Sequence, residues 1–152
     1  MSLKITGAEL ERALRAAIDE LDRPQAENLC TTLQMRFERC GTEPLRCVCS
    51  FPCAPWASNR IDRLHGGALA GMLDQGMGIL CAAALGRVPP TVEMNIHYLR
   101  PAPIGPRLFV SAQADSTGRS FWHIHCTAFA EDEPDKPVAT ASGVYFSGEY
   151  RK

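Results

Sequence analysis

The fold of this chain is decided by residues 59–74, which have the sequence NRIDRLHGGALAGMLD. A polar loop leads here through one histidine and a Gly-Gly pair into an apolar helical pattern. Glycine inside a helix costs about 1 kcal/mol relative to alanine. Its repeated use from Gly66 to Gly78 therefore suggests that a backbone or a ligand approaches closely. Asp74 lies among apolar and small residues, where a charged side chain is unfavourable unless it has a partner or a function.

The helical pattern continues to about Leu85. Between Ala68 and Leu85 there is no Lys, Arg or Glu, and Asp74 is the only charge. A helix that is apolar on nearly all faces is a buried helix. Gly86 and the prolines that follow prevent its continuation. We therefore expect one long central helix inside the domain, too short and too interrupted by glycine to span a membrane.

Strands are expected on both sides of this helix, at residues 29–38, 45–51, 91–99, 108–114, 121–130 and 138–146. Residues 7–21 have the apolar spacing of a helix, with Thr6 as N-cap and Glu9 three positions later. Hairpin connections predict a mostly antiparallel sheet of about six strands, curled around the central helix. We expect one α+β domain over residues 29–152, preceded by an N-terminal helix and linker over residues 1–28.

The composition fits a soluble globular protein, with 152 residues, 22% charged residues and a formal net charge of -1. This balance does not favour nucleic acid or an anionic membrane as a partner. Acidic residues near the start of the chain argue against a signal peptide, so we expect a cytoplasmic protein. The 7 cysteines are then reduced thiols. Cys47, Cys49 and Cys53 suggest zinc, but no fourth ligand is evident, so no metal site is predicted.

The chain resembles the hotdog-fold thioesterases, specifically the PaaI-like acyl-CoA thioesterase group. The matching residues are Asn59, His65, Gly66, Gly67, Asp74, residues 91–102, Gly105, Gly118, Arg119 and residues 138–141. Their order and spacing across residues 29–146 are more specific than any single piece. The resemblance implies a hotdog fold and hydrolysis of an acyl-CoA to free acid and CoA, with no metal or other cofactor. It also implies a homodimer with joined sheets and a shared active site, or a dimer of dimers.

The resemblance also assigns roles to residues at the site. Asp74 is the candidate general base or nucleophile. Gly66 lies where the helix begins, so its N–H lacks an intrahelical partner and could donate to the thioester oxyanion. Asn59 and His65 either face the substrate or hold the loop. In the PaaI-like group, a Ser or Thr at the place of Thr91 assists the attacking water from the other subunit.

Substrate binding is assigned to Gly67 and to three basic residues. Coenzyme A carries phosphates, and Arg100, Arg119 and Lys136 lie in turns from which a side chain can reach an anion. Arg119 is the strongest candidate because it follows Gly118 in a hairpin turn. For the other two, a solvated turn charge is an equally good interpretation.

Two other functions stay open at this point. A hotdog hydratase or dehydratase would add water reversibly to an enoyl thioester and release no thiol. Such enzymes pair a His with an acidic residue in different motifs, so the arrangement of His65 and Asp74 favours the thioesterase. A non-catalytic acyl-CoA-binding protein would leave the ester intact. Fold analogy does not fix the acyl group.

Overall fold

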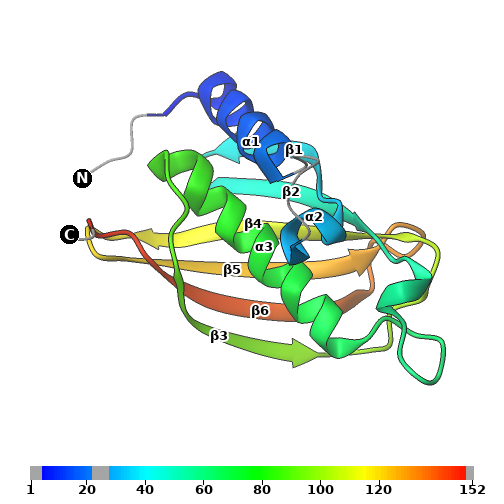
Figure 1. Ribbon diagram of the computed structural model, residues 1–152. Coiled ribbons are helices and arrows are strands. Elements are labelled where there is room, and N and C mark those ends of the chain that lie inside the picture. The colour runs from blue at the N-terminus through cyan, green and yellow to red at the C-terminus, as the bar shows by residue number, and fades with distance from the viewer. Residues whose placement is uncertain (1–4, 22–27, 150–152) are drawn as a thin grey trace.

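A computed structural model describes residues 5–21 and 28–149 of the chain. Its elements are, in order, α1 (Gly7–Leu21), α2 (Leu29–Leu33), β1 (Arg36–Thr42), β2 (Leu45–Pro52), the 3-10 helix η1 (Pro55–Ala57), α3 (Gly66–Leu85), β3 (Thr91–Tyr98), β4 (Arg107–Thr117), β5 (Phe121–Ala130) and β6 (Pro137–Phe146). The strands form one antiparallel six-stranded sheet in the order β1-β2-β4-β5-β6-β3. Helix α3 lies across one face of this sheet, with α1 and α2 on the same side (Figure 1). The predicted α+β hotdog architecture is confirmed.

Helix α3 packs tightly against strand β4 because the helix residue at this contact is a glycine, Gly76. A Cβ atom at Gly76 would lie 2.7 Å from Cγ1 of Val110 on β4, so a larger residue would push the helix away. Met72, Leu73 and Met77 are fully buried around this contact. By length and composition α3 is also long enough to cross a membrane, so the expectation that it is too short for this was wrong. Its apolar character is explained by its burial in the core.

Helix α1 begins as the sequence predicts. The backbone N–H of Thr6 donates to Oε2 of Glu9 at 2.8 Å, and the N–H of Glu9 donates to the Thr6 hydroxyl at 3.3 Å. This reciprocal pair is a capping box. Leu10, Leu14 and Ile18 are buried, and the helix contacts both α3 and β1. The predicted linker after α1 falls largely on residues 22–27, outside the described residues.

The prediction of a strand from residue 29 was wrong for its first half. Leu29–Leu33 form the short helix α2, and β1 begins at Arg36. The side chain of Asn28 accepts a hydrogen bond from the N–H of Thr31 and caps the helix, while Gln34 ends it with φ 49. Local capping therefore overrides the alternating pattern of apolar side chains.

The cysteines lie mostly inside the fold, and all seven are free. Cys47 and Cys49 are buried on β2 together with Phe51, and Val48 and Ser50 between them are buried as well. Burial raises the pKa of the Cys81 and Cys126 thiols to about 12. Such thiols stay protonated at neutral pH and are poor nucleophiles. Within residues 5–21 and 28–149, no group of three or more His, Cys, Asp and Glu side chains is placed to hold a metal ion.

Candidate active site

The carboxylate of Asp74 is the centre of the candidate site. It is half-buried on α3, and its Oδ1 accepts hydrogen bonds from the hydroxyl of Thr91 at 2.8 Å and from that of Tyr145 at 3.0 Å. Among the described residues, Oδ2 has no hydrogen-bond partner. One oxygen is therefore held by the protein, while the other is left to accept a proton or to attack an electrophile.

Thr91 reaches Asp74 from within the same chain. The resemblance to the PaaI-like group implied that this residue acts from the other subunit, but the first residue of β3 lies beside α3 in a single copy. The reason is the connection after α3, which turns back after Gly86 and starts β3 next to the helix. Thr91 and Asp74 thus form one half of a site together.

Tyr145 is a residue that the sequence analysis missed. It lies on β6 opposite Thr91 on β3, and its ring is only 1% exposed. Burial, and then the nearby Asp74 carboxylate, raise the pKa of Tyr145 well above its ordinary value. The hydroxyl therefore stays protonated and acts as a donor. Alternation along β6 puts Tyr145 on the inner face, but the register that brings it to Asp74 is a tertiary property.

The start of α3 forms a second group of polar atoms. His65 is the N-cap, and its Nδ1 accepts a hydrogen bond from the N–H of Gly67 at 2.9 Å. This hydrogen bond implies the neutral tautomer with the ring proton on Nε2. The N–H of Gly67 is thereby used within the chain. The N–H of Gly66, by contrast, meets no acceptor within the described part of the chain, which suits a donor to an oxyanion.

Gly66 and Gly67, the two glycines of this turn, differ in what a larger side chain would contact. A Cβ atom at Gly67 would lie 3.2 Å from Nδ1 of His65 and would crowd the cap. A Cβ atom at Gly66 would meet nothing closer than the Tyr98 ring at 3.6 Å, an ordinary contact. The packing of this chain therefore does not require glycine at 66. Close approach of a molecule from outside would require it.

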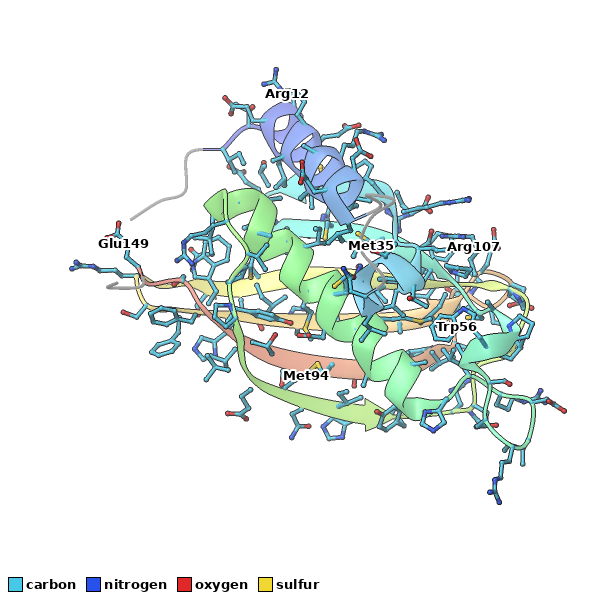
Figure 2. All side chains as sticks on the ribbon, viewed as in Figure 1. Arg12, Met35, Trp56, Met94, Arg107 and Glu149 are labelled. Atoms are coloured by element: carbon cyan, nitrogen blue, oxygen red, sulfur yellow. The ribbon has the colours of Figure 1, made fainter. Side chains whose placement is uncertain are left out.

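Asn59 holds the loop that leads into α3. Its Oδ1 accepts hydrogen bonds from the N–H groups of Ile61 at 3.0 Å and Arg63 at 3.1 Å. This is an Asx-type turn, and it agrees with the loop-holding role, one of the two roles expected for Asn59 from the sequence. Asn59 also lines a surface groove with Gly66 and Arg100. Figure 2 shows Trp56 on η1, beside this loop.

The predicted phosphate-binding residues do not gather in one place. Arg100 lines the groove at the start of α3, and Arg63, which sequence analysis did not select, lines the same groove. Lys136 is paired with the Glu133 carboxylate at 2.5 Å on the surface. Arg119 lies at the opposite end of β6, in a pocket with Ser120 and Phe146 to Glu149. Within one copy of the chain, Arg100 therefore lies in the same groove as Gly66, whereas Arg119 lies elsewhere.

An apolar pocket of about 300 Å³ opens beside Asp74. Asp74, Thr91 and Tyr145 form its polar end. The rest of its wall comes from α1, α2, α3 and the segment before β3. It is mostly apolar, with Gln75 as a further polar residue, and includes Leu21, Leu29, Gly78, Ile79, Ala82 and Val88. A pocket with a few polar groups at one end of an apolar wall suits a ligand with one reactive group and a hydrocarbon part.

Gly66 and Asp74 are eight residues apart on the same helix. At 1.5 Å per residue, the two positions are separated by about 12 Å along the axis. A single carbonyl group cannot be about 3 Å from both. Within one chain, the N–H of Gly66 and the carboxylate of Asp74 therefore belong to two separate half-sites.

The chain is similar in sequence to known thioesterases. The family model described as thioesterase superfamily matches residues 62–136. Acyl-coenzyme A thioesterase THEM4 of Rattus norvegicus is 33% identical over 108 residues, which cover 61% of this chain and 46% of the relative. Acyl-coenzyme A thioesterase 13 of Mus musculus is 29% identical over 79 residues, covering 51% and 56%. The chain spans about half the length of the curated relatives it matches.

Several solved structures share the fold. Zebra fish thioesterase superfamily member 2 has a TM-score of 0.74 at 22% identity, covering 95% of this chain and 100% of the other. The E. coli PaaI protein from the phenylacetic acid degradation operon has a TM-score of 0.76 at 17% identity, covering 93% and 95%. A hypothetical thioesterase of Streptococcus pneumoniae, solved with coenzyme A, has a TM-score of 0.65 at 19% identity, covering 74% and 86%. Over residues 62–136 the chain is similar to the thioesterase superfamily, and its fold is the hotdog fold of these solved structures, the E. coli PaaI protein among them.

Proposed function

We propose that this chain hydrolyses an acyl-CoA thioester to the free acid and CoA. The observation that carries the proposal is the Asp74 carboxylate beside an apolar pocket, held through Oδ1 and without a hydrogen-bond partner at Oδ2 within residues 5–21 and 28–149. The names of the rat and mouse relatives and the coenzyme A in the S. pneumoniae structure support the same substrate class.

Asp74 can act in either of two ways. As a general base, Oδ2 takes a proton from water while the water oxygen attacks the thioester carbon. The oxyanion then collapses, the carbon–sulfur bond breaks, and the CoA thiolate takes up the proton. As a nucleophile, Oδ2 attacks the carbon itself and expels the thiolate, and water then hydrolyses the mixed anhydride. Both routes need a donor at the oxyanion.

We propose that Gly66 of a second copy supplies this donor. The separation of about 12 Å along α3 excludes the donor of the same chain. Strand β3 is at the edge of the sheet, and Val92 and Tyr98 on it are more than half exposed. Pairing of two β3 edges around a two-fold axis would join the sheets and bring two copies of α3 side by side. The functional unit is then a homodimer, alone or within a dimer of dimers.

The groove at the start of α3 supplies the binding site for CoA in this proposal. Gly66, Asn59, Arg63 and Arg100 line it. The two arginines can bind phosphate oxygens through paired N–H groups. The thioester would then lie between this groove on one copy and the Asp74 pocket on the other.

A thiol-release assay tests the proposed function. The purified protein is incubated with short, medium, long and aromatic acyl-CoAs, and free CoA thiol is measured against time. We expect hydrolysis of at least one class, in a homodimer or larger species by light scattering. Binding of all esters without release, or reversible hydration of an enoyl-CoA without release, would instead support one of the two alternative functions.

The apolar pocket predicts how the acyl preference can be changed. Ala82 lines the pocket and is almost fully buried, so Ala82→Leu should fill part of the space. We expect kcat/KM for the longest good substrate to fall at least about tenfold, while acetyl-CoA changes little, because one lost methylene contact is worth about 1 to 3 kcal/mol. The assay is kcat/KM across acyl lengths, with Ala8→Leu on the exposed face of α1 as control. A uniform loss at all lengths would contradict this placement of the acyl group.

A further inference from the structure

We propose that Tyr145 is a positioning residue, which holds the Asp74 carboxylate so that Oδ2 faces the thioester; the inference rests on the proposed hydrolysis. Its hydroxyl lies 3.0 Å from Oδ1 of Asp74 and 3.2 Å from the main-chain oxygen of the same residue. The Tyr145 hydrogen is therefore shared between the side chain and the helix backbone that carries it. This contact fixes the carboxylate relative to α3 itself.

The ring of Tyr145 is held in place by two glycines. A Cβ atom at Gly143, two residues earlier on β6, would lie 2.8 Å from Cε2 and 3.3 Å from the hydroxyl oxygen of Tyr145. On the other side, a Cβ atom at Gly78 of α3 would touch Cε1 at 3.6 Å. Glycine at 143 is needed for this ring position, because real Cβ atoms do not approach so closely. The space beneath α3 is shaped to fit the tyrosine.

Thr91 and Tyr145 differ in how firmly they hold the same oxygen. Thr91 is exposed, so its hydroxyl can rotate and exchange its hydrogen bond with water. Tyr145 is 1% exposed, and its hydroxyl can move only with the ring. We therefore assign the fixed orientation of the carboxylate to Tyr145. Thr91 is left free to contact the attacking water.

The test is Tyr145→Phe, which keeps the ring and removes the hydroxyl. We expect kcat to fall about tenfold with KM within about twofold, because a charge-assisted hydrogen bond is lost and the ligand contacts are kept. In an Asp74→Asn background, Tyr145→Phe should have no further effect, since coupled residues are not additive.

A second variant moves the ring without removing the hydroxyl. Gly143→Ala should displace Tyr145 and reproduce the kinetic change, whereas Gly7→Ala, where an added Cβ meets nothing within 4 Å, should not. Thermal melting of each variant separates misfolding from mispositioning. Unchanged kcat in a folded Tyr145→Phe protein would overturn the inference.

A readout without turnover separates this inference from the proposed function. In crystal structures, the Asp74 carboxylate should keep one orientation in the unmodified protein and should rotate or become disordered in Tyr145→Phe, because the contact that holds Oδ1 is lost. If the protein hydrolyses no thioester and this difference is present, the proposed function fails and the positioning contact stands. If hydrolysis is found and neither this difference nor the kinetic change appears, the assignment of Tyr145 fails alone.

Discussion

Asp74→Asn is expected to lower kcat/KM for acyl-CoA hydrolysis by about 10² to 10⁴, the range typical of losing a general base. Asparagine has nearly the same shape, and its side-chain oxygen can still accept hydrogen bonds from Thr91 and Tyr145, so the fold should be kept. An amide neither takes a proton from water nor attacks a thioester carbon at neutral pH. The measurement is initial-rate thiol release together with thermal melting.

Asp132→Asn is the matched control for this variant, because Asp132 is an exposed aspartate in the turn between β5 and β6. It should retain the activity of the unmodified protein. A folded Asp74→Asn protein with activity within about threefold of the parent would remove Asp74 from the chemistry.

Gly66→Pro is expected to lower kcat by about 10² to 10³, the cost of removing one oxyanion donor. Proline lacks the N–H, yet it is well accepted at the first position of a helix. The preceding residue, His65, already has the extended conformation that proline requires, with φ -65 and ψ 135. The substitution therefore removes the donor at a position where the backbone should tolerate it. The measurement is kcat in the thiol-release assay.

Gly66→Ala is the comparison variant, because it keeps the N–H and within the chain its Cβ meets only the Tyr98 ring at 3.6 Å. Any loss of kcat in Gly66→Ala therefore measures crowding of the bound substrate, and Gly66→Pro should lose more because it also removes the donor. A folded Gly66→Pro protein with normal kcat would show that this N–H does not face the oxyanion.

Mixing the two inactive variants tests whether the half-sites come from different subunits. In a hybrid dimer of Asp74→Asn and Gly66→Pro chains, one site carries both changes and the other carries neither. Random mixing of a two-fold dimer gives half hybrids, so about a quarter of the unmodified activity should return. Absence of any recovery after proven subunit exchange would show that Gly66 and Asp74 do not meet across an interface.

Much of the fold was predictable because the strongest patterns in the chain are local. The apolar run of α3, its terminal Gly86 and the alternating strands each specify their element within a few residues. The exception is α2, where the Asn28 cap and the positive φ of Gln34 override an alternation that extends over the same residues. A single side-chain hydrogen bond at a helix start can thus decide between helix and strand.

The sequence was enough to select Asp74 and Gly66 as candidate site residues. It was not enough to predict which side chains donate hydrogen bonds to Asp74. Asp74 stands out as the charge in an apolar helix, and Gly66 stands out at the start of that helix. That Tyr145 shares Oδ1 of Asp74 with Thr91 depends on the register of β6 against β3. Register comes from the whole sheet and not from the last strand. The sequence therefore indicates the candidate carboxylate better than the hydroxyls that donate hydrogen bonds to it.

The unpaired edge of β3 connects the solubility of the protein with its proposed catalysis. In the described sheet, β3 pairs only with β6, and exposed apolar side chains flank its free backbone groups. An unpaired edge of this kind recruits other strands and promotes aggregation. Substitutions that loosen a β3–β3 contact would thus lower solubility as well as catalysis. Selection against aggregation would then also preserve the proposed shared site.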